Sequence, residues 1–182
     1  MDNVSSLPSA LAQYLNKSTV ALALSETGGD TPLVLVNDAF CKLTGYDADD
    51  VLNRNCRFLQ GPGTTEETRR ALGDFVRGQG PDQGRFPILN YRKDGTTFHN
   101  YVFMTRLKDN AGRTRYILAS QFDMTTALMR SRLRANDEKL RRALTDVEQI
   151  GRESGLAMME SAKLLADSVA VMAQLSLRDT ET

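Results

Sequence analysis

The composition of the chain changes sharply near residue 123, and this change limits the folds that it can adopt. Residues 124–182 contain two glycines, no proline and no aromatic residue, and they are rich in Leu, Ala, Met, Arg and Glu. Such a composition favours helix. The residues before this point hold glycine-containing turns, aromatic residues and β-branched runs, which are typical of a domain that mixes strands and helices. We therefore expect one α+β domain followed by a helical tail.

The order of the expected elements predicts an antiparallel sheet with helices on one face. We expect strands at 19–25 and 33–36, helices at 37–44, 47–51 and 64–77, and strands at 85–93, 96–107 and 113–122. The Asp-Gly step in YRKDGTTF favours a hairpin between two of these strands, because glycine accepts positive φ. Two strands, a helical middle and a three-stranded meander would leave a pocket between the sheet and the helical middle.

Charge, hydropathy and cysteine content argue against several classes of protein. Lys plus Arg and Asp plus Glu both total 23, so no overall field attracts nucleic acid or an anionic membrane. The apolar runs are shorter than the roughly 20 residues of a membrane helix, and the N-terminus lacks the pattern of a signal peptide. The two cysteines have neither the number nor the spacing of a disulfide framework or a zinc site. We expect a cytoplasmic protein with no metal, nucleic acid or membrane partner.

The stretch NRNCRFLQGPG, residues 53–63, places one cysteine, Cys56, between an asparagine and an arginine. It could be a buried structural residue, a catalytic or redox thiol, or a thiol held beside a bound cofactor. A catalytic thiol needs a base to form the thiolate. The only histidine, His99, lies in an expected strand, and no third residue that would orient it is evident. Composition alone favours a small buried hydrophobe, which is also the interpretation of Cys41.

The segment NCRFLQG at 55–61 resembles the signature of LOV domains, the flavin-binding blue-light sensors of the PAS superfamily. VNDAFCKLTGY upstream, NYRKDGTTFHN downstream and SQFDMT at the end of the last strand are similar to the family in the same order. The resemblance implies the PAS/LOV fold, a five-stranded antiparallel sheet with helices on one face. We divide the chain into an N-terminal helical cap (1–18), a flavin-binding core (19–126) and a C-terminal helical extension (127–182) with a break near 151–155. One departure is Asn53, where the family usually has glycine; asparagine tolerates left-handed backbone better than most residues.

The resemblance implies a noncovalently bound FMN with Cys56 just beneath its ring. Blue light would drive reversible addition of the thiol to ring carbon C4a, with a proton going to N5. Gln121 would bond N5 and relay the signal by rotating its amide, while Arg57 and Arg70, preferred over Arg69, would hold the phosphate. The other expected contacts are Asn55 and Gln60 to the ribityl chain and phosphate end, Leu59 on the ring, and Asn90 and Asn100 at the pyrimidine edge.

The tail carries more apolar surface than one small sheet can bury. Its last helix is expected to present two apolar faces, one with Ala166, Val169 and Ala173 and the other with Leu164, Leu165, Val171, Met172 and Leu175. Large exposed apolar patches are unusual on monomers, so we expect a homodimer through the helical extensions. The alternative is that the last helix folds back on its own domain.

The length of the chain leaves no room for an enzymatic effector beside the core and tail, so we expect a sensor rather than an enzyme. Its output would be a light-dependent change in dimerisation or in association with a separate downstream signalling protein. The alternatives are a flavin-based redox sensor of PAS type and a non-photoactive PAS interaction module. A helix-turn-helix around RESG is a weaker possibility, because Lys163 is the only cationic residue of the second helix before Arg178.

Overall fold

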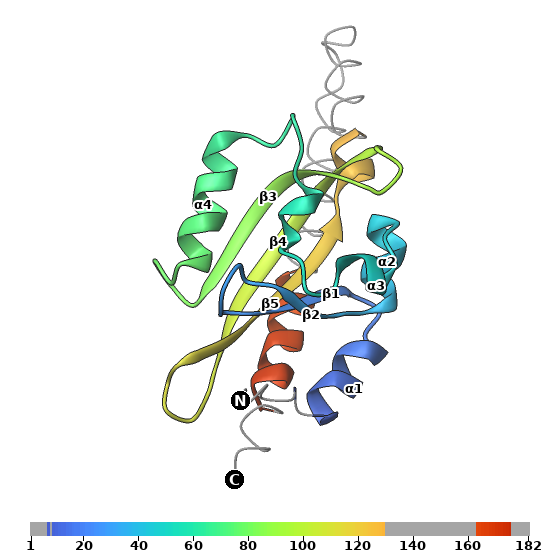
Figure 1. The fold of residues 1–182 in the computed structure, drawn as a ribbon. Helices are drawn as coiled ribbons and strands as arrows, with labels where there is room; N and C mark the ends of the chain where they lie inside the picture. Colours follow the sequence, from blue (N-terminus) through green and yellow to red (C-terminus); the bar gives the residue numbers. More distant parts are fainter. Residues whose placement is uncertain (1–6, 8, 130–162, 176–182) are drawn as a thin grey trace, which may run out of the picture.

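A five-stranded antiparallel sheet forms the centre of the computed structural model, which describes residues 7, 9–129 and 163–175. Its strands lie in the order β2-β1-β5-β4-β3 (Figure 1). They are β1 (Ala21–Glu26), β2 (Leu33–Val36), β3 (Gln83–Tyr91), β4 (Thr97–Lys108) and β5 (Thr114–Asp123). The last strand therefore lies in the middle, paired with both β1 and β4. This confirms the expected α+β fold and its five-stranded antiparallel sheet.

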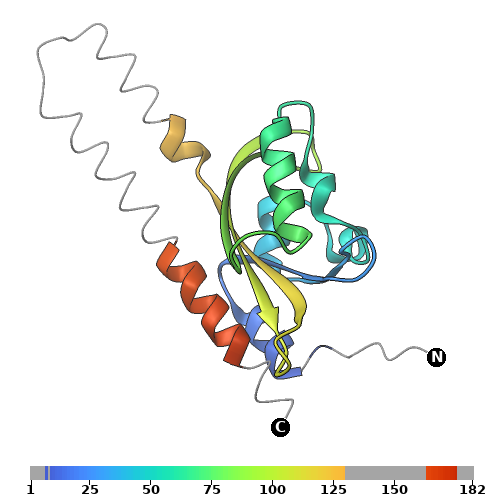
Figure 2. The ribbon, with the colours of Figure 1, turned by 90° about the vertical axis from the view of Figure 1, so that its left-hand side faces the viewer.

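The helices lie on both faces of this sheet (Figure 2). On the inner face lie α2 (Asp38–Thr44), α3 (Ala48–Val51), the short 3₁₀ helix η1 (Cys56–Leu59) and α4 (Glu66–Val76). On the outer face lie α1 (Ser9–Lys17) and a helix of residues 163–175. These inner helices were predicted from the sequence, except for η1, which is only four residues long.

Asn37, at the end of β2, fixes α1 and α2 to the sheet. Its side-chain oxygen accepts hydrogen bonds from the backbone N–H groups of Phe40 and Leu22, at 3.0 and 2.9 Å. The first of these bonds is the N-cap of α2. Its amide nitrogen donates to three carbonyl groups around the end of α1, those of Leu15, Ser18 and Val20. A single buried asparagine thus satisfies backbone groups from three elements.

A buried arginine on β4 holds the C-terminal end of α4 over the inner face. Arg106 is 6% exposed, and its guanidinium lies 4.3 Å from the centre of the Phe75 ring. It donates to four carbonyl groups, that of Phe75 in the last turn of the helix and those of Gln79, Gly80 and Pro81 after it. A buried cation thereby binds the carbonyl end of the α4 dipole.

The helix of residues 163–175 packs on the outer face beside α1. Both helices contribute to one apolar cluster with strand side chains: Leu11, Leu15, Leu22, Leu24, Leu35, Leu107, Tyr116, Leu118, Val169, Ala170 and Ala173. The Gln174 amide accepts from the N–H of Lys108 at 3.0 Å and donates to its carbonyl at 2.9 Å. This double contact occurs where the pairing of β4 with β5 shifts register, between Leu107 and Lys108.

The last helix thus folds back on its own domain, but only one of its two apolar faces is covered. Ala166, Val169 and Ala173 are buried, as the spacing predicts. The other face stays exposed, with side chains between 46% and 66% accessible: Leu164, Leu165, Val171, Met172 and Leu175. The break expected near 151–155 falls outside the described residues. None of the described helices is both long enough and apolar enough to cross a membrane.

Candidate cofactor site

A cavity lies between the inner face of the sheet and the segment formed by η1 and α4. Its volume is about 640 Å³, including the space open to solvent at its mouth. All the expected site residues except Arg70 line it: Asn55, Cys56, Arg57, Leu59, Gln60, Asn90, Asn100 and Gln121. Its apolar walls come from Ala23, Leu33, Leu72, Val76, Ile88, Val102, Met104, Ile117 and Ala119.

The segment before Cys56 is anchored to β2 by its backbone. Asn53 donates its N–H to the carbonyl of Leu33 at 2.8 Å, and the N–H of Leu33 donates to Arg54 at 2.9 Å. This pairing requires a left-handed residue, and Asn53 has a φ of 62°. Asparagine tolerates this conformation better than most residues. The two bonds fix where η1 begins, and Cys56 is its first residue.

The environment of Cys56 keeps its sulfur protonated. Burial raises the pKa of the Cys56 thiol to about 12, and no neighbouring cation lowers it. At neutral pH the residue is therefore a thiol, whereas catalytic and redox cysteines act as thiolates stabilised by a base or a positive charge. This argues against the catalytic interpretation. Cys41 lies on α2 against the apolar cluster around Phe40, which fits a packing role.

Three buried amides from three adjacent strands form a hydrogen-bonded chain at the far end of the cavity. Asn100 donates from its NH₂ group to the side-chain oxygens of Asn90 and Gln121, at 3.0 and 2.8 Å. Asn90 in turn donates to the carbonyl of Leu59, at 3.0 Å. The Asn100 side-chain oxygen is buried and has no partner among the described residues. An unpaired buried acceptor is costly, so this end of the cavity is suited to a ligand that donates a hydrogen bond.

Polar side chains lie at the mouth of the cavity. Asn55 accepts from the N–H of Arg57 at 3.0 Å and donates to the carbonyl of Asp30 at 2.5 Å. The Arg57 guanidinium pairs with the carboxylate of Asp30. Gln60 follows at the end of η1. Asp30 is not among the residues predicted from the sequence, because it lies 27 positions before Arg57 and carries no local motif.

Neither of the two arginines of α4 lines the cavity, and they differ in what they contact. With about 100° of rotation per helical residue, Arg69 lies about 60° from the cavity-lining Leu72, whereas Arg70 lies about 160° away. Arg69 donates to the carbonyls of Gly61 and Thr64, at 2.7 and 3.2 Å, in the loop that follows Gln60. Arg70 is exposed and does not line the cavity.

The described residues contain no group of three side chains suited to hold a metal ion. The cavity instead combines an apolar slot, amides at one end and an arginine at the other. Such an arrangement can bind a flat, half-polar ligand with an anionic end.

Comparison with known sequences gives a consistent result. The model of the PAS domain family matches residues 19–126. A blue-light-activated histidine kinase of Brucella canis is 42% identical over 101 residues, which are 56% of this chain and 20% of that protein. The chain thus spans about a fifth of the length of this relative.

Comparison with solved structures gives the same family of folds. A LOV domain from a blue-light activated histidine kinase of Erythrobacter litoralis has a TM-score of 0.56 and 35% identity, covering 60% of this chain and 99% of that one. An RNA-binding light-oxygen-voltage receptor has a TM-score of 0.60 and 29% identity, covering 88% of this chain and 39% of that one.

Proposed function

Since the chain belongs to the PAS domain family and has LOV sensors among its relatives, we propose that it is a blue-light photoreceptor that binds FMN beside Cys56. In this proposal residues 19–126 are the sensor core, residues 1–18 are a helical cap and residues 127–182 carry the output. The relatives named as blue-light-activated kinases support light as the stimulus.

The unpaired oxygen of Asn100 is the observation that carries the proposal. A flavin pyrimidine ring presents both donors and acceptors along one edge, and amides can match both. Asn90 and Asn100, 3% and 2% exposed, offer such groups at the closed end of the cavity. Arg57 lines the open end, where the ribityl chain and the phosphate would lie with Asn55 and Gln60. Leu59 would pack on the ring, and Arg69, rather than Arg70, would support the phosphate end.

A bound flavin excited by blue light would supply a ring carbon, C4a, for reversible addition of the Cys56 sulfur, and the thiol proton would go to N5. The chain contributes the position and protonation state of the thiol. Because the pKa of Cys56 is raised to about 12 by burial, the residue brings its own proton at any physiological pH. A standing base is therefore unnecessary, in agreement with the apolar walls around η1.

Gln121 is suited to convert a change at the ring into a change in the sheet. Its side-chain oxygen accepts from Asn100, and its NH₂ group has no bond to the residues that the structure describes. Rotation of this amide would exchange donor and acceptor, at a cost of about 0.5–1.5 kcal/mol for a hydrogen bond lost. Such a change biases two populated states without unfolding the domain.

The end of β5 connects Gln121 to the tail within a few residues. The Asp123 carboxylate accepts from the N–H of Thr125, the first residue of a helix at 125–129, at 2.8 Å. The same carboxylate pairs with Arg92 of the hairpin before β4, at 2.6 Å. A shift of β5 would therefore reach the start of the helical extension. The exposed apolar face on residues 164–175 would receive a second copy of the chain, giving a homodimer whose strength depends on light, or a separate signalling protein.

An absorption spectrum of the purified protein in the dark, after blue light and during recovery tests the photocycle. We expect the flavin band to bleach and return in the wild type, and to persist under light in Cys56→Ala. Cys41→Ala is the matched control, because it removes the other thiol and should leave the cycle intact. A colourless protein would contradict flavin binding. Bleaching that requires a reductant, with recovery that requires oxygen, would support a redox sensor instead.

The mass of the particle in solution, measured in the dark and under blue light over a range of concentrations, tests the output. We expect a dimer whose dissociation constant changes with illumination. Val171→Asp, on the exposed face, should weaken the dimer, because it places a charge in the apolar contact. The same monomer in both states at high concentration would contradict self-association as the output.

A further inference from the structure

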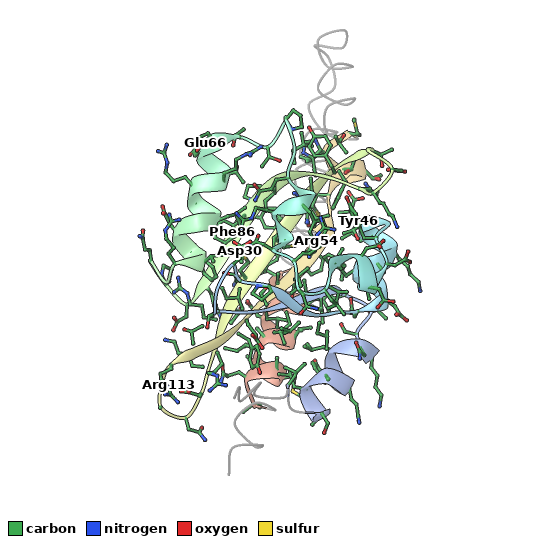
Figure 3. The ribbon with its side chains drawn as sticks, viewed as in Figure 1. Asp30, Tyr46, Arg54, Glu66, Phe86 and Arg113 are labelled. Atoms are coloured by element: carbon green, nitrogen blue, oxygen red, sulfur yellow. The ribbon has the colours of Figure 1, made fainter. Side chains whose placement is uncertain are left out.

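Asp30 lies in the loop between β1 and β2 (Figure 3). It contacts two side chains at the mouth of the cavity. Its carboxylate pairs with the guanidinium of Arg57, and its carbonyl accepts from the side-chain amide of Asn55 at 2.5 Å. Arg57 and Asn55 both line the cavity, whereas Asp30 does not line it and is exposed to solvent. The side chains expected at the phosphate end therefore already have a partner in the protein.

The loop around Asp30 is tight and internally bonded. Gly29 and Thr31, on either side of Asp30, have positive φ values of 55° and 53°. The N–H of Thr31 donates to Gly28 at 3.0 Å, and the N–H of Glu26 donates to the carbonyl of Pro32 at 3.1 Å. Positive φ at a threonine is uncommon and is kept only where neighbouring contacts hold it. The position of Asp30 is thus built into the loop.

Arg57 is the cationic side chain that lines the cavity in the described part of the chain. The two nearest arginines in the sequence have other partners. Arg54 donates to the carbonyl of Asp50 at 2.8 Å and lies over the Phe58 ring. Arg69 holds the loop carbonyls of Gly61 and Thr64. The positive charge that faces an incoming phosphate is therefore mainly that of Arg57, and Asp30 counters it.

We propose that Asp30 is a specificity-determining residue of the flavin site, because its carboxylate competes with the FMN phosphate for Arg57. A phosphate group and a carboxylate on one guanidinium repel each other, and riboflavin, which lacks the phosphate, does not meet this repulsion. The site therefore distinguishes FMN from riboflavin less strongly than an unpaired arginine would. This inference rests on flavin binding as the proposed function.

The test compares the dissociation constants of riboflavin and FMN for the flavin-free full chain, measured by quenching of flavin fluorescence. Asp30→Asn keeps the shape of the side chain and removes its charge. We expect the ratio of the riboflavin constant to the FMN constant to rise by about threefold to tenfold at low salt, and by less at high salt, where exposed charges are screened. Asp49→Asn, on the exposed part of α3, removes the same charge away from the cavity lining and should leave the ratio unchanged.

The outcomes separate this inference from the function on which it rests. If the wild type binds neither flavin, the proposed function fails and the role of Asp30 with it. If both flavins bind and Asp30→Asn leaves their ratio unchanged, the competition is absent while flavin binding stands. A ratio that falls in Asp30→Asn also overturns the inference, since Asp30 would then help Arg57 to hold the phosphate.

Discussion

Removal of the Cys56 thiol should change how the flavin-free protein responds to alkaline pH. Burial raises the pKa of this thiol from an ordinary value of 9.0 to about 12 in the folded state. Between these values the unfolded chain has lost the thiol proton and the folded chain retains it. Because the unfolded state then binds fewer protons, the free energy of unfolding falls as pH rises. The slope is about 1 kcal/mol per pH unit, so about 1.5 kcal/mol should be lost between pH 9 and 10.5.

Urea unfolding followed by circular dichroism, with a reductant present, measures this loss at several pH values. The informative quantity is the difference in unfolding free energy between the wild type and Cys56→Ala. This difference should be constant below pH 8. Above pH 9 the wild type should lose stability relative to Cys56→Ala. The pKa of Cys41 is also raised, chiefly by burial and also by Asp38 and Asp47. Cys41→Ala should therefore show an effect in the same direction. A difference that stays constant from pH 8 to 10.5 would refute the raised pKa of the Cys56 thiol in the folded protein.

Three further substitutions test the framework around the site. Asn37→Ala should lower the unfolding free energy by about 3 kcal/mol, since it removes a helix cap and leaves buried groups unpaired; an unchanged urea midpoint would contradict this. Gln174→Ala should speed hydrogen exchange in residues 163–175 while β1 stays protected, because its two bonds to Lys108 are lost; equal exchange would show that the apolar contacts suffice. Gly61→Ala should lower the melting temperature, because a Cβ there would lie 2.4 Å from the Tyr91 ring; an unchanged melting temperature would mean that the ring moves freely.

The elements with strong local signals were predicted well from the sequence. The strand expected at 33–36 is β2, Leu33–Val36, and the helix expected at 64–77 is α4, Glu66–Val76. The hairpin expected at Asp94-Gly95 joins β3 and β4, and Gly95 has a φ of 84°. Alternation, capping and turn residues act within a few positions, so a single sequence records them.

The features that the sequence did not predict depend on orientation or on distant contacts. Arg69 and Arg70 are neighbours of the same type, and only the rotation of α4 relative to the sheet decides which one faces the loop after Gln60. Asp30 meets Arg57 because the loop after β1 folds toward η1, which no local pattern indicates. The side-chain oxygen of Asn100, which has no partner among the described residues, is evident only in the structure, where three adjacent strands bring their amides together.

The shared cluster on the outer face makes α1 and the helix of residues 163–175 a single cooperative layer. Leu11 and Leu15 of α1 are fully buried, and Val169 and Ala173 of the other helix pack in the same cluster. Release of either helix from the sheet would expose apolar surface on the other. The two helices would therefore detach together and not independently. Displacement of α1 would therefore loosen the packing of the helix of residues 163–175, and displacement of that helix would loosen α1.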